Sequence, residues 1–272
     1  MSIANDFPAD VPDQPELVTF EREGDLGWIT LQRPEVMNCL SFPTLRRFRT
    51  LLEELREDLS LRALLITGAG EKAFCAGADL KERRTMPDER VPEFVRHIRG
   101  LMDDVEAMPQ PTIAVINGFA FGGGTELALA SDLRIVAEHV TLGLTEVTLA
   151  IIPGAGGTQR LPRLIGKSRA KDLILTGRRV GAAEAEAIGL ANRVAPAAEL
   201  RARAAELGGT IAANGPIAVR AAKDAIDRGV ELPMEAALEH EARCYQRVLG
   251  TSDRLEALKA FAEKRKPAFQ GE

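Results

Sequence analysis

The strongest constraint on the fold is an alternation of two hydrophobic periods along the first half of the chain. Apolar residues recur at helical spacing over 45–59, and the stretch RALLIT at 62–67 then reads as a short buried strand. The same succession of a helix and a strand recurs, with a helical run over 91–105 and the strand TIAVI at 112–116. Strands that alternate with helices predict a layered α/β core rather than a β-sandwich or a helical bundle.

The pattern differs at the two ends of the chain. Residues 17–32 predict a β-hairpin, because β-prone runs flank a Gly-Asp turn. In the last third the strand signals stop, and Pro216, Pro233 and Ser252 each stand where a helix could begin. We expect a disordered tail over 1–15. The other two predicted units are a core domain over 16–205 and an all-helical domain over 206–272.

Charge and targeting signals narrow the classes of function. The net charge is -5, but residues 1–25 hold seven acids and one base, which leaves 33 acids and 34 bases elsewhere. A nearly neutral body offers no broad basic face for nucleic acid.

The N-terminus lacks the segments of a signal peptide, and no stretch approaches the roughly 18 apolar residues of a membrane span. The cysteines Cys39, Cys75 and Cys244 have no CxxC spacing, which favours a reducing compartment. We expect a cytoplasmic protein without membrane contact.

Several catalytic classes are disfavoured by the sequence. The motif GAGEKA at 68–73 mimics a dinucleotide fingerprint, but no helix opens within it. The three histidines His97, His139 and His240 do not suggest a triad or a metal site, and we expect His97 on the polar side of its helix. Cys75 has no histidine nearby in sequence, so a small buried thiol is the commoner interpretation.

Two turns rich in small residues each follow a strand and precede a helix. Gly122, Gly123 and Gly124 lie before the helical run TELALA, and the turn CAGAD spans 75–79. Uncovered N–H groups at a helix start can stabilise an anion, so each turn could give one N–H to an oxyanion. The alternative is that both are only tight connections between elements.

Two acids stand alone in apolar surroundings. Glu126 lies in GGGTELALA and Glu146 in LGLTEVTLAII, and burial would raise the pKa of each carboxyl toward the range useful in acid/base catalysis. The structural alternatives are specific. Glu126 could cap its own helix, and Glu146 could pair with a buried arginine such as Arg160.

Three long motifs, GAGEKAFCAGADLKE, NGFAFGGGTELALASDLRI and GLTEVTLAIIPGAGGTQRLPRLIGKSRAKDLILTG, give the chain a close resemblance to the enoyl-CoA hydratase/isomerase (crotonase) family. The match runs from about Leu17 to the C-terminus. The resemblance implies an α/β fold, a spiral of β-β-α units, followed by a C-terminal all-helical trimerisation segment. It also implies a homotrimer or a homohexamer, an acyl-CoA thioester as substrate, and no metal and no cofactor apart from the CoA of the substrate.

The resemblance also assigns residues. It implies an oxyanion hole made by the backbone N–H groups of Ala78 and Gly123. Of the two glutamates, it implies that Glu126 orients and activates a water and that Glu146 protonates C2 of the substrate. The implied substrate or CoA contacts are Ala76, Ala78, Asp79, Leu80, Lys81, Gly123 and Lys264. The expected activity is hydration of a 2-enoyl-CoA, and a double-bond isomerase is the runner-up.

Within that family the chain especially resembles the methylglutaconyl-CoA hydratases, through ADLKER and DRLEALKAFAEKRKPAFQGE among other motifs. This makes 3-methylglutaconyl-CoA a plausible substrate. One relative there binds RNA through a lysine-rich helix. The counterpart here, PTLRRFRTLLEELREDLS, has no lysine and balances its arginines with acids. We therefore predict no useful RNA affinity, a prediction that salt-sensitive submicromolar binding would overturn.

Overall fold

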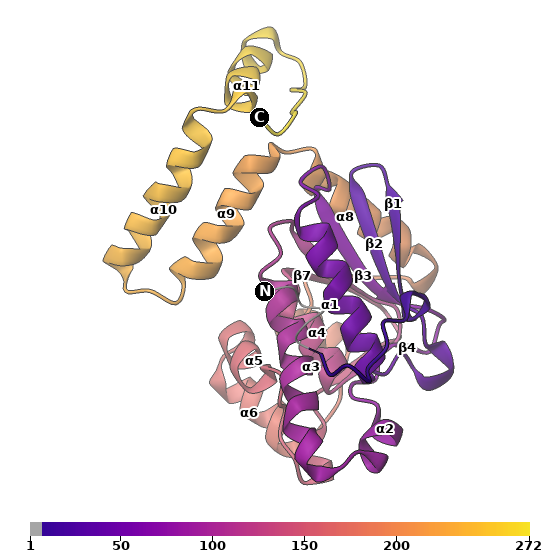
Figure 1. The fold of residues 1–272 in the computed structure, drawn as a ribbon. Coiled ribbons are helices and arrows are strands. Elements are labelled where there is room, and N and C mark those ends of the chain that lie inside the picture. Colours follow the sequence, from indigo (N-terminus) through magenta and orange to yellow (C-terminus); the bar gives the residue numbers. More distant parts are fainter. Residues whose placement is uncertain (1–6) are drawn as a thin grey trace.

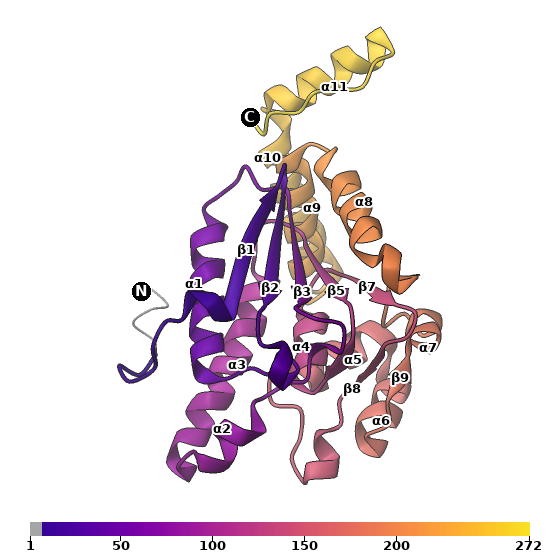
Figure 2. The same ribbon diagram turned by 90° about the vertical axis from the view of Figure 1, so that its right-hand side faces the viewer.

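A computed structural model describes residues 7–272 of the chain, and its core contains two β-sheets surrounded by helices (Figures 1 and 2). The larger sheet has six strands in the order β1-β2-β3-β5-β7-β10. These are β1 (Val18–Glu23), β2 (Leu26–Leu31), β3 (Ala63–Gly68), β5 (Thr112–Ile116), β7 (Leu133–Ala137) and β10 (Arg193–Ala195). The smaller sheet has the order β4-β6-β8-β9, made of β4 (Ala73–Cys75), β6 (Phe119–Phe121), β8 (Thr141–Gly143) and β9 (Val180–Gly181).

The two sheets are built from a repeated unit. In each of the pairs β3/β4, β5/β6 and β7/β8, the first strand enters the large sheet and the second enters the small one, and successive units add in parallel. The helices of this core are α1 (Phe42–Arg56), α2 (Leu80–Thr85), α3 (Val91–Glu106), α4 (Gly123–Ala130), α5 (Gly157–Ile165), α6 (Lys167–Thr176), α7 (Ala182–Ala187) and α8 (Leu200–Ala212). The predicted α/β fold with its spiral of β-β-α units is confirmed.

Local signals account for where the elements begin and end. The hairpin of β1 and β2 is antiparallel, with Glu23 opposite Leu26, as the Gly-Asp turn predicts. Ser41 caps α1, because its hydroxyl accepts a hydrogen bond from the N–H of Thr44. The strands β3 and β5 are buried along nearly their whole length, which explains why they read as continuous apolar runs rather than as alternating ones.

Three helices extend from the core as an arm, α9 (Pro216–Gly229), α10 (Met234–Leu249) and α11 (Ser252–Glu263), as Figure 1 shows. They begin at or next to the predicted residues. The helix before them, α8, packs against β2, β3, β5 and β7 and spans residue 205. The domain boundary placed at 205 stays a prediction. Among the described residues no helix combines the length and the apolar character that a membrane crossing requires.

Two expectations about α3 and the N-terminus differ from the structure. His97 is fully buried rather than on the polar side of α3, and its ring stacks on Phe7 with the centroids 4.0 Å apart. Residues 1–6 of the predicted tail lie outside the described residues. From Phe7 onward the expected disorder is wrong, because the side chains of Phe7 and Val11 are buried in the core and Asp10 pairs with Arg90. Burial of these two apolar side chains stabilises the ordered path of this short stretch.

Candidate active site

The two turns that the sequence singles out meet in space. The turn at 75–79 follows β4, the glycine turn at 122–124 follows β6, and these strands are neighbours in the small sheet. A Cβ added to Gly123 would lie 3.7 Å from the backbone nitrogen of Ala78. At Gly77, where φ is +91°, a Cβ would lie 3.0 Å from the backbone nitrogen of Gly123. The two N–H groups named in the prediction are therefore adjacent, and glycine is required where the turns touch.

Both N–H groups are available to a ligand. Leu40 bridges the first turn by donating to Gly77 O (2.8 Å) and accepting from Asp79 N (2.9 Å), which leaves the N–H of Ala78 on the opposite side. Gly123 is the first residue of α4, where N–H groups have no partner inside the helix. Within the part of the chain that the structure describes, neither N–H donates to a protein acceptor. Two such donors side by side at the start of a helix can stabilise an anion.

A buried polar network fixes the first turn. Asn38 is 1% exposed, and its amide donates to the carbonyls of Ala69 (3.0 Å) and Ala73 (2.8 Å). The Asp79 carboxylate caps α2 through the N–H groups of Lys81 and Glu82. It also pairs with Arg33 at 2.9 Å. Asp79 thus holds the turn, and its predicted place among the CoA contacts stays a prediction.

Glu126 is held by a distant loop. Its side chain comes from the first turn of α4 and is 3% exposed. Its Oε1 accepts hydrogen bonds from the backbone N–H groups of Ala155 and Gly157, both at 2.8 Å. Burial raises the pKa of Glu126, while these two hydrogen bonds and the positive charge of Arg160 oppose the rise. The capping alternative is wrong, because the carboxylate binds this loop instead of its own helix start.

Glu146 has the opposite kind of surroundings. It opens a short 3₁₀ turn, Glu146–Leu149, and a Cβ on Gly122 would lie 3.2 Å from its Oε1. Its Oε2 is buried and finds no hydrogen-bond partner among the described residues. Burial, together with the nearby charge of Glu126, raises the pKa of Glu146 to about 7. The pairing with Arg160 is wrong, since that arginine binds Asp103 and Glu106 at 2.9 and 2.6 Å.

The two carboxyls and the two N–H groups therefore form one cluster. Glu146 lies beside Gly122, Gly123 follows, and Glu126 comes one turn later on α4. Hydrogen bonds favour the ionised form of Glu126, and the lack of a partner favours the protonated form of Glu146. A pair of carboxyls whose environments separate their protonation states is the arrangement that acid/base catalysis uses.

The remaining predicted contact residues lie in two places. Ala76 is half-buried, while Leu80 and Lys81 are exposed at the start of α2 beside the first turn. Lys264 ends α11, and Figure 2 shows that helix at the far end of the arm, away from α4. Within one chain, then, Lys264 does not approach the oxyanion turns.

Other groups considered from the sequence take structural positions. Burial raises the pKa of the Cys75 thiol to about 12, which keeps it from acting as a thiolate nucleophile near neutral pH. His240 and Cys244 of α10 lie beside Asp224 of α9, a grouping with metal-ligand side chains that the sequence did not indicate. Arg228 and Arg247 already bind that carboxylate at 2.8 and 2.6 Å, so it serves as an ion-pair centre between the two helices.

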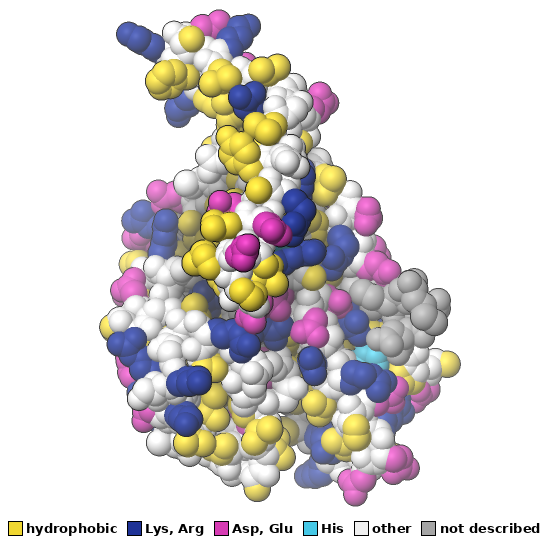
Figure 3. Space-filling view, turned by 90° about the vertical axis from the view of Figure 1, so that its left-hand side faces the viewer, with side chains coloured by type: hydrophobic (Ala, Val, Ile, Leu, Met, Phe, Trp, Pro, Cys, Tyr) yellow, Lys and Arg dark blue, Asp and Glu magenta, His cyan; other side chains and the backbone are white. Residues whose placement is uncertain are grey.

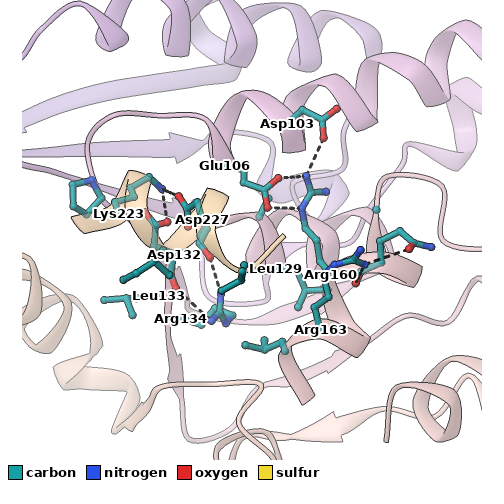
Figure 4. Close-up of a pocket in the computed structure, with 18 of the residues that line it drawn as sticks. Asp103, Glu106, Leu129, Asp132, Leu133, Arg134, Arg160, Arg163, Lys223 and Asp227 are labelled. Carbon is teal, nitrogen blue, oxygen red and sulfur yellow. Dashed lines mark hydrogen bonds and ion pairs between the residues drawn. The ribbon is translucent and has the colours of Figure 1, made fainter. Parts of the chain in front are cut away.

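A cavity of about 1070 Å³ lies between the core and α9 (Figure 4). It is lined by Leu129 and Asp132 at the C-terminal end of α4, by Arg160 of α5 and by Lys223 of α9. The residues that line it do not include Ala78, Gly123 or Glu146. This space is therefore separate from the cluster of N–H groups and carboxyls.

Sequence reasoning missed the donors of Ala155 and Gly157 and the ion pairs of Arg160. The available signal was the run PGAGG at 153–157, in which Gly156 has φ +104°. Such a run indicates a backbone that approaches another group closely. It does not indicate which group, because Glu126 lies about 30 residues earlier in the chain.

Comparison with known proteins identifies the family of this chain. Residues 21–272 match the family described as enoyl-CoA hydratase/isomerase. The chain is 51% identical over 246 residues to a Bacillus subtilis protein named putative enoyl-CoA hydratase/isomerase YngF, covering 90% of this chain and 95% of that one. It is 42% identical to the mouse mitochondrial methylglutaconyl-CoA hydratase, covering 98% of this chain and 87% of that one. The crystal structure of an enoyl-CoA hydratase from Bacillus anthracis has a TM-score of 0.93, with 52% identity, and covers 94% of this chain and all of that one. The chain belongs to the enoyl-CoA hydratase/isomerase family, and it is an enzyme.

The raised pKa of Glu146 predicts that this carboxyl destabilises the fold at alkaline pH. In the unfolded chain the group ionises near its ordinary pKa of 4.5, whereas in the folded chain it does so only near 7. As pH rises from 4.5 to 7 the unfolded state is therefore increasingly favoured, and the loss of stability is complete above 7. Glu146→Gln removes this loss, so we expect it to be more stable than the wild type at pH 8 by about 1 to 3 kcal/mol, with the gain shrinking toward pH 4.5.

Thermal unfolding of both proteins at several pH values tests this expectation. Glu138→Gln, which changes an exposed glutamate, is the matched control. A Glu146→Gln gain that stayed constant from acid to alkaline pH would contradict the assigned titration.

Proposed function

We propose that this enzyme reversibly adds water across the C2–C3 double bond of 2-enoyl-CoA thioesters. The observation that carries the proposal is the pair of carboxyls in different environments, Glu126 and Glu146, carried on or beside the turn and helix that also present two adjacent N–H donors. The family acts on acyl-CoA thioesters, and the names of several relatives include hydratase, which supports the reaction class.

The two N–H groups meet the charge that the reaction develops. When water attacks C3 of a conjugated thioester, electron density moves onto the thioester oxygen. We assign that oxygen to the N–H groups of Ala78 and Gly123, which are fixed by the turns and need no rearrangement. Loss of one donor of this kind typically raises the barrier by about 3 to 4 kcal/mol.

The environments of the carboxyls divide the proton transfers between them. The Oε1 of Glu126 is engaged by two N–H groups, so its other oxygen is the one we assign to the attacking water. Glu146 keeps a proton up to about neutral pH and has a buried oxygen without a partner, so we assign to it the proton that reaches C2. Each then acts in the protonation state that its surroundings favour.

Substitution of either glutamate tests these roles. We expect Glu126→Gln and Glu146→Gln each to lower kcat/KM for hydration by about 10²- to 10⁴-fold, because each removes one proton transfer and changes few contacts. The measurement is turnover of a panel of enoyl-CoAs by each variant, with Glu138→Gln as the control. Wild-type hydration by either active-site variant would contradict the assignment. An enzyme that shifts the double bond without adding water would favour the isomerase alternative.

We further propose that the active enzyme is a homotrimer or a pair of trimers. The described part of the arm exposes many large apolar side chains, and Figure 3 shows them gathered over the projecting helices. Phe261 is 86% exposed, Met234 75% and Val230 74%. An apolar surface of this kind is typical of an interface. If Lys264 contacts the CoA of a substrate, the distance of α11 from α4 means that it does so in a neighbouring subunit.

Light scattering after size exclusion tests the assembly. We expect a mass three or six times that of the chain, which is 29.4 kDa. Replacing Val230 and Phe261 by aspartate, which puts charges into the apolar surface, is expected to shift the mass toward that of one chain. Arg96→Asp, which changes an exposed charged residue of α3, is the control for charge alone. A wild-type protein that is monomeric at micromolar concentration would overturn the proposal.

Substrates with different acyl groups are candidates within this reaction class. The likeness to the mouse methylglutaconyl-CoA hydratase makes 3-methylglutaconyl-CoA one candidate. That substrate carries a free carboxylate at the far end of its acyl chain, which a simple enoyl chain lacks. A comparison of kcat/KM for crotonyl-CoA, longer enoyl-CoAs and 3-methylglutaconyl-CoA distinguishes the candidates, because an enzyme built for the carboxylate discriminates strongly against chains without it.

No cofactor beyond the CoA of the substrate is included in the proposal. Two N–H groups and two carboxyls provide every charge stabilisation and proton transfer that the hydration requires. Dialysis against a chelator is therefore expected to leave turnover unchanged, and a loss of activity that a metal restores would contradict this.

We propose a cytoplasmic location, in keeping with the free thiols of Cys39, Cys75 and Cys244.

A further inference from the structure

The position of the Glu126 carboxylate depends on a loop that has little structure of its own. Residues 153–156 are neither helix nor strand, and α5 begins at Gly157. The loop nevertheless supplies both N–H groups that hold Glu126, from Ala155 and Gly157. A contact from outside the loop must therefore keep each of these two nitrogens 2.8 Å from Oε1 of Glu126.

Arg160 is the side chain that joins the loop to the rest of the core. Its Nη1 donates to the carbonyl of Ala155 at 3.0 Å, the same residue whose N–H binds Glu126. On α3, Glu106 accepts from its Nε (3.3 Å) and its Nη2 (2.6 Å), and Asp103 accepts from its Nη2 (2.9 Å). Figure 4 shows this guanidinium beside the two acids, with which it lines the cavity.

The backbone is shaped to receive the guanidinium. Gly156 has φ +104°, and a Cβ there would lie 2.2 Å from Nη1 of Arg160. The side chain of Arg160 is 14% exposed, whereas those of Asp103 and Glu106 are 53% and 52% exposed. The arginine is thus the enclosed member of the cluster, lying directly on the loop, and its two acids are the solvent-facing anchors.

We propose that Arg160 is a positioning residue for Glu126, because it fastens the loop 153–157 to α3 and so keeps two N–H donors on the Glu126 carboxylate. This inference rests on the proposed function in taking Glu126 as the group that activates water. Arg160 makes no hydrogen bond to Glu126 in the described structure, so it acts through the loop and through its charge. Glu146 lies in the same cluster, and the charge of Glu126 contributes to its raised pKa.

An arginine suits this task better than a lysine. The planar guanidinium reaches the carbonyl of Ala155 and both carboxylates of α3 at once, in three different directions. A lysine ammonium is a single point of charge, which would keep the electrostatic effect but not all the links. Arg160→Lys should therefore recover part of what Arg160→Gln loses.

Steady-state kinetics over a range of pH test the proposal. We expect Arg160→Gln to lower kcat by about 10- to 100-fold while KM changes by less than about threefold, because the loop positions the base and the CoA contacts lie elsewhere. We also expect the acidic limb of the pH profile to move to higher pH, since Glu126 loses two hydrogen-bond donors and a nearby positive charge. Arg163→Gln is the matched control, because Arg163 lies on the same helix and lines the same cavity but pairs with the exposed Glu231.

A second pair of changes protects the test against misfolding. Asp103→Asn combined with Glu106→Gln leaves the loop and Arg160 intact and alters only half-exposed side chains. We expect this double variant to fold normally and to lower kcat with little change in KM, as Arg160→Gln does, because the loop loses its anchors on α3 while the charge of Arg160 stays. An unchanged kcat in a folded double variant, or an unshifted acidic limb in a folded Arg160→Gln, would overturn the proposal.

A direct titration separates this inference from the proposed reaction. Infrared spectroscopy follows the protonated carboxyl of Glu126 in a Glu146→Gln background, and the signal is assigned by its loss in Glu126→Gln. Arg160→Gln should raise the pH at which this signal disappears, whatever reaction the enzyme catalyses. A wild-type enzyme that hydrates no enoyl-CoA would contradict the proposed function. A Glu126 titration that is unchanged by Arg160→Gln would contradict the role of Arg160.

Discussion

The close approach of two turns that lack side chains is the contact on which the site depends. A Cβ on Gly77 would lie 2.8 Å from the carbonyl oxygen of Phe121, and one on Gly124 would lie 1.9 Å from the carbonyl oxygen of Cys75. The backbones can meet only because both positions are glycine. Their meeting is imposed by the small sheet, in which β4 and β6 are parallel neighbours, so each turn leaves its strand at the same edge. The spiral of β-β-α units thus brings together two N–H groups that lie 45 residues apart.

The electrostatic asymmetry of the site follows from backbone hydrogen bonds, to which the charge of Arg160 adds. Glu126 and Glu146 are both buried carboxyls, and no cation contacts either one among the described residues. What separates them is that two N–H groups of a distant loop hold the Glu126 carboxylate, whereas Glu146 has only its own backbone N–H and a buried Oε2 without a partner among the described residues. Ionisation of the buried Glu146 is a cost to folding that an uncharged glutamine would avoid, and such costs are typical of functional sites. This difference in hydrogen bonding is also what assigns opposite roles to two identical side chains.

The parts of this structure that local pattern could predict are those with a long period or a clear stop signal. The helices of the arm begin at or beside Pro216, Pro233 and Ser252, and the buried strands β3 and β5 lie where their apolar runs are. The strands β4, β6 and β8 have three residues each, too few for a period, and they exist because neighbouring units pair with them. Phe7 and His97 were misjudged for a related reason, since an aromatic stack between a terminal segment and a helix leaves no local signal.

For the site, the sequence could name the reacting groups but not what holds them. Glu126, Glu146 and the two turns stand out because each breaks a local pattern, and the family resemblance then links them. The groups that tune Glu126 are a loop about 30 residues later and an arginine whose acids lie on α3, and none of these is close to it in sequence. Such links are set by the packing of α3, α4 and α5, because only the folded chain determines which backbone N–H faces which carboxylate. A few residues thus identify the chemistry of the site, whereas the fold as a whole determines the protonation states of its two carboxyls.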